Sequence, residues 1–87
     1  MVNAQRLARL HPNSYEVPTY EELDEISVGD YVYVINNDEP IGLRVVSIYG
    51  KTLICSALSK CFYNNIVVGS CLPVKYSNIF GYRKLPE

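Results

Sequence analysis

Short β-type segments separated by tight turns occupy the middle of the chain. Valine, isoleucine, threonine and tyrosine, which favour extended backbone, are frequent there and partly alternate with a two-residue period. This pattern predicts strands over residues 31–35, 41–49, 52–58, 66–68 and 71–76. The dipeptide Gly50-Lys51 has the length and the leading glycine of a type II′ hairpin turn. Pro73 places the last strand at a sheet edge or beside a bulge, because proline cannot donate a hydrogen bond to a neighbouring strand.

The residues before the strands predict one short helix. Thr19 is a favourable N-cap, and Glu22 three residues later completes a capping box for a helix over residues 20–26. We expect residues 1–10 to form either one or two helical turns or a flexible arm. We expect residues 81–87 to form a mobile tail.

The length and the strand pattern together restrict the fold. The chain has 87 residues, enough for one small hydrophobic core and therefore for a single domain over 1–87. A meander of four or five short strands has to curl or be covered in order to bury one face and protect its edges. We therefore predict a mainly β fold, either a small SH3-like barrel or a strongly bent antiparallel sheet, with one short N-terminal helix.

Composition excludes several classes of protein. With 48% hydrophobic residues and a net charge of −1, the chain is not disordered. Its apolar runs are far shorter than the roughly 20 residues of a membrane span. Arginines interrupt the N-terminal residues, which therefore do not have the apolar run expected of a signal peptide. We expect a cytoplasmic protein that does not contact membranes. The three cysteines match neither a complete disulfide set nor a zinc site, so we expect free thiols, no metal and no cofactor.

Acidic and basic residues are separated along the chain. Residues 13–39 contain eight acidic residues and no lysine or arginine, whereas residues 40–87 contain six basic residues and one acidic residue. An acidic face can dock on basic partners, and a basic face suits phosphate or nucleic acid.

Residues with the spacing of a catalytic site are not found in the sequence. His11 is the only histidine, and it precedes a proline in an expected loop. The glycines occur singly, so they do not form a phosphate-binding loop. We expect no enzymatic activity.

The N-terminal half carries a combination of short motifs. They are His11-Pro12, the aromatic Tyr15, Val17-Pro18-Thr19, Glu21-Glu22, and Gly29-Asp30 before the first strand. This combination resembles the pattern of a set of small uncharacterised bacterial and phage domains, over about residues 11–80. The second-strand tryptophan of that pattern is replaced here by Leu43-Arg44, and its Asn-Asp-Pro by residues 56–61. The resemblance implies a compact β-rich domain and no known reaction.

Tyrosine is unusually frequent, with eight residues in 87 and no tryptophan. Tyr31 and Tyr33 share one face of the first strand, so they form an exposed aromatic strip if the alternating valines point inward. We therefore favour a non-catalytic binding module that occupies a protein partner, for instance a phage-encoded inhibitor of a host or defence protein. The expected contact residues are Tyr31, Tyr33, Glu21, Glu22, Asp24 and Glu25.

The alternative is a nucleotide- or nucleic-acid-binding domain with a basic, tyrosine-rich face. Its phosphate contacts would come from Arg44, Lys51, Lys60 and Lys75, and its stacking contacts from Tyr49, Tyr63 and Tyr76. A homo-oligomer formed through exposed sheet edges is a third possibility.

Overall fold

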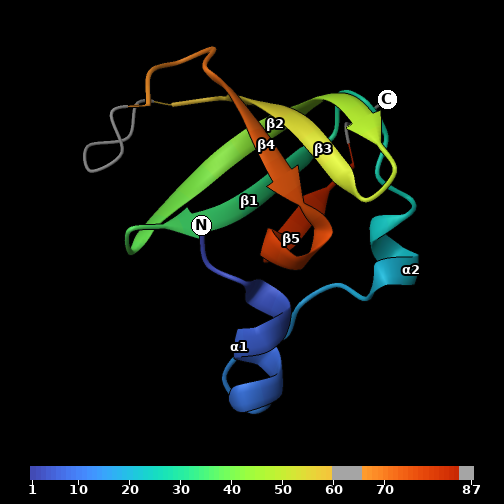
Figure 1. The fold of residues 1–87 in the computed structure, drawn as a ribbon, viewed down its shortest axis with the longest axis vertical. Coiled ribbons are helices and arrows are strands. Elements are labelled where there is room, and N and C mark those ends of the chain that lie inside the picture. Colours follow the sequence, from blue (N-terminus) through green and yellow to red (C-terminus); the bar gives the residue numbers. More distant parts are fainter. Residues whose placement is uncertain (60–65, 85–87) are drawn as a thin grey trace.

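A computed structural model describes residues 1–59 and 66–84 of the chain. In chain order the elements of these residues are α1 (Ala4–Leu10), α2 (Tyr20–Leu23), β1 (Tyr31–Asn36), β2 (Glu39–Tyr49), β3 (Thr52–Ala57), β4 (Cys71–Lys75), the 3₁₀ turn η1 (Tyr76–Asn78) and β5 (Gly81–Arg83). The five strands form one antiparallel sheet in the order β4–β3–β2–β1–β5 (Figure 1). The prediction of a mainly β fold is confirmed.

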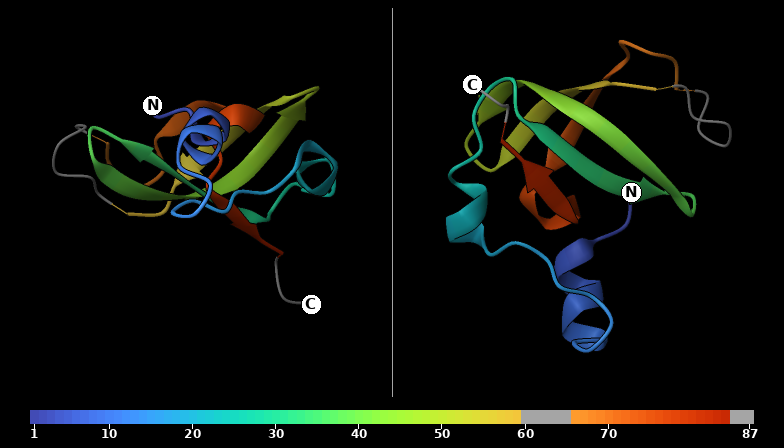
Figure 2. Two further views of the ribbon diagram at one scale, coloured as in Figure 1. Left: turned by 90° about the horizontal axis from the view of Figure 1, so that it is seen from below. Right: turned by 180° about the vertical axis from the view of Figure 1, so that it is seen from behind.

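The sheet is strongly bent around β2. Residues 39–44 of this strand pair with β1 and residues 43–49 pair with β3, with a register shift between Val45 and Ser47. Such a bulge bends the strand and increases its twist. The bend is visible from several directions (Figure 2). Within the described residues β4 and β5 remain the two edges, so the sheet curls without closing into a barrel.

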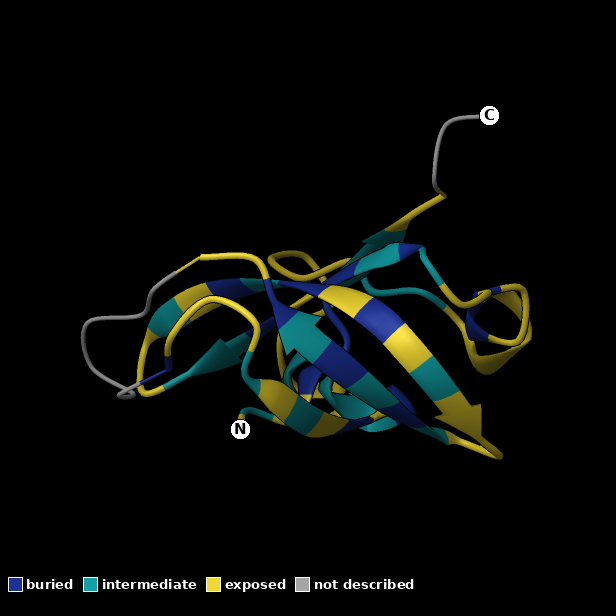
Figure 3. Ribbon diagram, turned by 90° about the horizontal axis from the view of Figure 1, so that it is seen from above, coloured by how far each residue is buried: buried dark blue, intermediate teal, exposed yellow. Residues whose placement is uncertain are grey.

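The core lies on the concave face of the sheet. Buried and exposed residues alternate along the strands (Figure 3). The inward residues of the first three strands are Val32, Val34, Ile41, Leu43, Val45, Leu53, Cys55 and Ala57. Leu23 and Ile26 cover them from the α2 segment, and Ile79 covers them after η1. Because the valines of β1 point inward, Tyr31 and Tyr33 point outward.

Both hairpin turns follow from their residues. Asn37 and Asp38 have positive φ angles of 51° and 62°, as the two central residues of a type I′ turn require. Gly50 has a φ of 60° and is followed by Lys51, so the leading glycine supplies the conformation that a type II′ turn needs at this position.

Two helices precede the sheet: the one predicted from the capping box, and one within residues 1–10, where helical turns or a flexible arm were expected. The capping box of Thr19 and Glu22 begins α2 as predicted. The helix ends at Leu23, earlier than the predicted Ile26. The amides of Glu25 and Ile26 bond to carbonyls only three residues back, and this tighter turn directs Ile26 into the core. Residues 4–10 form α1, and the preceding Val2 donates its amide to the carbonyl of Ile35 in β1.

Two predicted segments differ in the structure. Residues 81–83, expected in a mobile tail, form β5 and pair with β1. Residues 66–68 do not form a strand: Ile66 makes an isolated bridge and is buried, whereas Val67 and Val68 are exposed. The confirmed edge strand is β4, which contains Pro73. Residues 85–87 lie outside the described residues.

The buried thiol of Cys55 predicts a loss of stability in alkali. Burial, and to a smaller extent the neighbouring Cys71, raise the pKa of Cys55 from 9.0 to about 11. The unfolded chain therefore releases this proton first, so the free energy of unfolding falls as the pH rises from 9 toward 11. We expect a loss of about 2 kcal/mol at pH 11, measured by urea unfolding at a series of pH values.

Cys55→Ala is the control for this prediction. The variant is less stable at neutral pH because a buried sulfur is lost, but its stability should fall less between pH 9 and 11. A smaller decline in the free energy of unfolding remains in this variant. Burial and a hydrogen bond with Asp24 raise the pKa of Tyr76, so this group also destabilises the folded state as the pH rises. Equal pH dependence in both proteins would contradict the prediction.

Candidate binding surface

The strand register places an aromatic pair between arginines and glycines on the outer face of the sheet. Tyr31 lies opposite Arg44 of β2 on one side and opposite Arg83 of β5 on the other. Tyr33 lies opposite Gly42 and Gly81 in the same two strands. Because paired residues point to the same face, these six residues share one surface.

A hollow of about 370 Å³ opens beside this pair. Its lining includes Tyr31, Tyr33, Gly42, Leu58 and Arg83, and we call it the outer-face hollow. Leu58 follows β3 and donates its amide to the carbonyl of Gly42 at 3.2 Å. A Cβ atom added at Gly42 would meet nothing within 4 Å. The missing side chain of Gly42 therefore leaves open space between Tyr33 and Leu58.

The ring of Tyr33 extends from β1 over the backbone of β5. A Cβ atom at Gly81 would overlap this ring, so only glycine allows the ring to lie there. Despite this contact, Tyr33 remains 49% exposed. The ring is thus positioned by the sheet while a large part of its surface is available to a partner.

Two guanidinium groups lie beside the aromatic pair. The Cζ atom of Arg44 is 6.0 Å from the centroid of the Tyr31 ring, within the range of a cation–π contact. Arg83 lies on the other side of Tyr31, at the rim of the outer-face hollow. Neither arginine forms an ion pair with a residue in the described part of the chain.

A second groove lies along β5 and shares Arg83 and Tyr82 with the outer-face hollow. Its volume is about 550 Å³, and its other walls include Glu16, Pro18 and Glu22 from the segment around α2 and Lys84 after β5. Strand β5 therefore separates an apolar hollow that contains the tyrosines from a groove with acidic side chains. We call this second feature the acidic groove.

The structure does not gather the predicted acidic contact residues into one site with the tyrosines. Only Glu22 lines the acidic groove, and its side chain also caps α2. Asp24 is hydrogen-bonded to the side chain of Tyr76. Glu21 is exposed on α2, and the backbone carbonyl of Glu25 accepts a hydrogen bond from Lys84.

The residues of the alternative ligand site are also dispersed. Tyr76 is buried and packs edge-on against Tyr20, with the ring centroids 5.7 Å apart, so its predicted stacking role is wrong. Lys51 lies over the Tyr20 ring at the tip of the β2–β3 hairpin. Tyr49 of β2 and Lys75 of β4 both lie opposite Thr52 of β3, at the same end of the sheet as Lys51. Arg44 lies five residues before Tyr49 on β2. Lys60 and Tyr63 lie outside the described residues.

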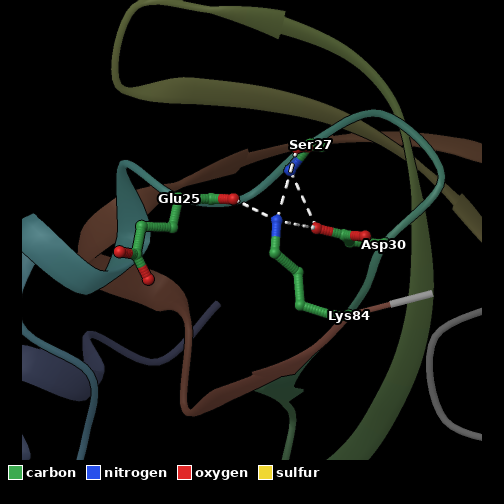
Figure 4. A network of polar contacts seen from close by, with 4 residues as sticks. All are labelled: Glu25, Ser27, Asp30 and Lys84. Carbon is green, nitrogen blue, oxygen red and sulfur yellow. Dashed lines mark hydrogen bonds and ion pairs between the residues drawn. The ribbon is translucent and has the colours of Figure 1, made fainter. Parts of the chain in front are cut away.

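A buried carboxylate fixes β5 to the loop before β1 (Figure 4). Asp30 is buried, and its Oδ2 atom accepts the Ser27 amide at 2.9 Å and the Lys84 Nζ at 3.0 Å. Lys84 also donates to Ser27 Oγ at 3.3 Å and to the backbone carbonyl of Glu25. These four residues form what we call the latch, which holds the end of β5 next to the hollow.

Gly42, Leu58 and Arg83 are site residues that the sequence did not reveal. Gly42 is a glycine inside a strand, a pattern that indicates only a bulge or a close approach of backbone. Leu58 and Arg83 have no comparable signal, because the position of Leu58 beside Gly42 and that of Arg83 beside Tyr31 depend on how the strands pair.

The remaining observations concern metal sites, membranes and similarity. Among residues 1–59 and 66–84, no three histidine, cysteine, aspartate or glutamate side chains form a group suited to a metal ion. In the same residues no helix has the length and apolar character needed to cross a membrane. The chain matches no protein-family model, no curated protein and no solved structure.

Proposed function

We propose that this chain is a non-catalytic binding module that acts by occupying a protein partner at the outer-face hollow. The observation that carries this proposal is the half-exposed Tyr33 beside Tyr31 in an apolar hollow. Tyrosine offers a large contact area with few rotatable bonds, and it is enriched among the residues that dominate binding energy. Tyr33 is also held in place over Gly81, which lowers the entropy lost on binding.

The proposal extends to the fold type and the biological role. The meander from β1 to β4, followed by η1 and a last strand paired with β1, supports the assignment of an SH3-like fold. A phage-encoded inhibitor of a host or defence protein is the role we propose, because such an inhibitor needs only a surface that blocks its target. We place this role in the cytoplasm.

The tyrosine pair can be tested by capture of partners from a host lysate. We expect that the wild-type chain retains a partner that the Tyr31→Ala/Tyr33→Ala variant loses by at least about tenfold, as removal of a binding hot spot does. Tyr49→Ala is the matched control, because Tyr49 is 68% exposed at the far end of β2. Quantitative mass spectrometry measures the captured proteins. The proposal is wrong if the double variant captures the same proteins as the wild type.

Nucleotide binding is a second candidate because Arg44 lies over Tyr31. An arginine beside an exposed ring can hold a phosphate while the ring stacks on a base. A ligand that binds the folded state raises the melting temperature, so a thermal-shift screen with nucleotides tests this candidate. A shift that Arg44→Gln abolishes and Lys75→Gln preserves would favour the nucleotide over the protein partner.

A further inference from the structure

We infer that the occupant of the outer-face hollow is an acidic segment of a partner protein, with an apolar side chain seated over Gly42 and carboxylates that reach Arg44 and Arg83. This inference rests on the proposed function, since it names the chemistry of the partner for the same hollow.

The shape of the hollow supports an apolar side chain at its centre. Gly42 forms the floor, and Tyr33 and Leu58 form walls on either side of it. Leu58 is 46% exposed, an apolar surface that a partner side chain would cover. Burial of this surface and of the two ring faces provides the hydrophobic part of the binding energy.

The charges beside the hollow support acidic neighbours of that side chain. Arg44 and Arg83 lie on opposite sides of Tyr31. Their Cα atoms are two strand spacings apart, about 10 Å, because neighbouring strands lie about 4.8 Å from each other. The outward positions of β1, β2 and β5 hold no acidic residue, and both arginines lack an ion pair within the described residues. In an extended peptide the residues two positions before and two positions after the apolar residue point to the same face as it does. They are about 13 Å apart, a distance that the long arginine side chains accommodate.

The surroundings of the hollow favour a peptide over a nucleic acid. The acidic groove begins directly beyond Arg83, with Glu16 and Glu22 in its wall, while its lysine, Lys84, is paired with Asp30 in the latch. A nucleic acid carries a phosphate at every nucleotide, so a strand that crosses β5 would meet these carboxylates. A peptide places its charges at chosen positions and can present neutral or basic residues to the acidic groove.

Chemical-shift mapping by NMR on the ¹⁵N-labelled full chain tests the inference. The probes are the capped pentapeptides Glu-Glu-Leu-Glu-Glu, Gln-Gln-Leu-Gln-Gln and Glu-Glu-Gly-Glu-Glu, together with adenosine monophosphate. We expect the first peptide to shift the amides of Tyr33, Gly42 and Arg83. The peptides without carboxylates or without leucine should bind at least about threefold more weakly, as expected for the loss of exposed ion pairs or of one apolar contact.

Variants of the two arginines complete the test. Arg44→Gln and Arg83→Gln should each weaken the acidic peptide about threefold, whereas Lys75→Gln on another part of the sheet should leave it unchanged. The inference is overturned if the glutamine peptide binds equally well, if adenosine monophosphate shifts the same amides at lower concentration, or if no probe shifts them. A lysate partner that depends on Tyr31 and Tyr33 but not on the arginines would overturn the inference and leave the proposed function intact.

Discussion

Replacing Lys84 with methionine is expected to lower the free energy of unfolding by about 3 kcal/mol. The substitution keeps the aliphatic part of the side chain and removes the ammonium group that pairs with Asp30. The Asp30 carboxylate is buried, so it would keep its charge while losing the contact with the Lys84 ammonium group. Removal of one partner from a buried ion pair costs about 3–5 kcal/mol, and the exposure of the Lys84 side chain places the expected loss at the lower end.

Urea unfolding of four proteins tests this prediction. Arg83→Met is the matched control, because Arg83 is the preceding residue and forms no ion pair in the described part of the chain, so its effect should stay within about 0.5 kcal/mol. The double variant Asp30→Asn/Lys84→Met should be more stable than Lys84→Met alone, because the neutral amide removes the buried charge and still accepts the Ser27 amide. A loss below 0.5 kcal/mol in Lys84→Met would show that water compensates for the missing ammonium group.

The latch also connects stability to the proposed binding surface. Lys84 directly follows β5, the strand that carries Arg83 at the rim of the outer-face hollow and Gly81 under the Tyr33 ring. Because β5 has only three residues, it has few ladder hydrogen bonds of its own to hold it against β1. The Asp30–Lys84 pair therefore keeps part of the binding surface in place, although none of the four latch residues lines the outer-face hollow.

The sequence predicted the elements whose signals are local. Thr19 and Glu22 are three residues apart and bond to each other, so four residues are enough to locate the start of α2. The hairpin at Gly50 is equally local, because the glycine itself supplies the positive φ. In contrast, β5 depends on pairing with residues about 50 positions earlier, and its three residues show no alternating pattern. Local propensity therefore indicated a tail where a tertiary contact forms a strand.

The candidate site was predictable in part for the same reason. Alternation within β1 was sufficient to place Tyr31 and Tyr33 on the outer face. The neighbours of these tyrosines follow from strand register, which set Gly42 and Gly81 beside Tyr33 and could not be deduced from either segment alone. The burial of Tyr76 has a similar origin, since η1 turns this residue toward α2, where it meets Tyr20 and Asp24.

Replacing Gly42 with valine is expected to weaken binding at the outer-face hollow strongly without a loss of stability. Gly42 lies inside a strand, its φ is not positive, and a Cβ atom there meets nothing within 4 Å. Valine favours extended backbone and loses less conformational entropy than glycine on folding, so the free energy of unfolding should stay equal or rise by up to about 1 kcal/mol. The added methyl groups fill the open space between Tyr33 and Leu58, where the partner's apolar side chain is proposed to bind. The affinity for a partner of this surface should therefore fall at least about tenfold.

The comparison with Thr52→Val separates occupation of the hollow from a general effect of valine on the sheet. Thr52 faces outward on β3, opposite Tyr49 and Lys75, and does not line the outer-face hollow. This control should bind as the wild type does, while Gly42→Val should fail to capture the partner that depends on Tyr31 and Tyr33. Urea unfolding and quantitative capture, measured on the same preparations, give both readouts. Full binding by a stably folded Gly42→Val protein would mean that the partner contacts the tyrosines from outside the hollow. The valine side chain would then fill the space above residue 42 without weakening the binding.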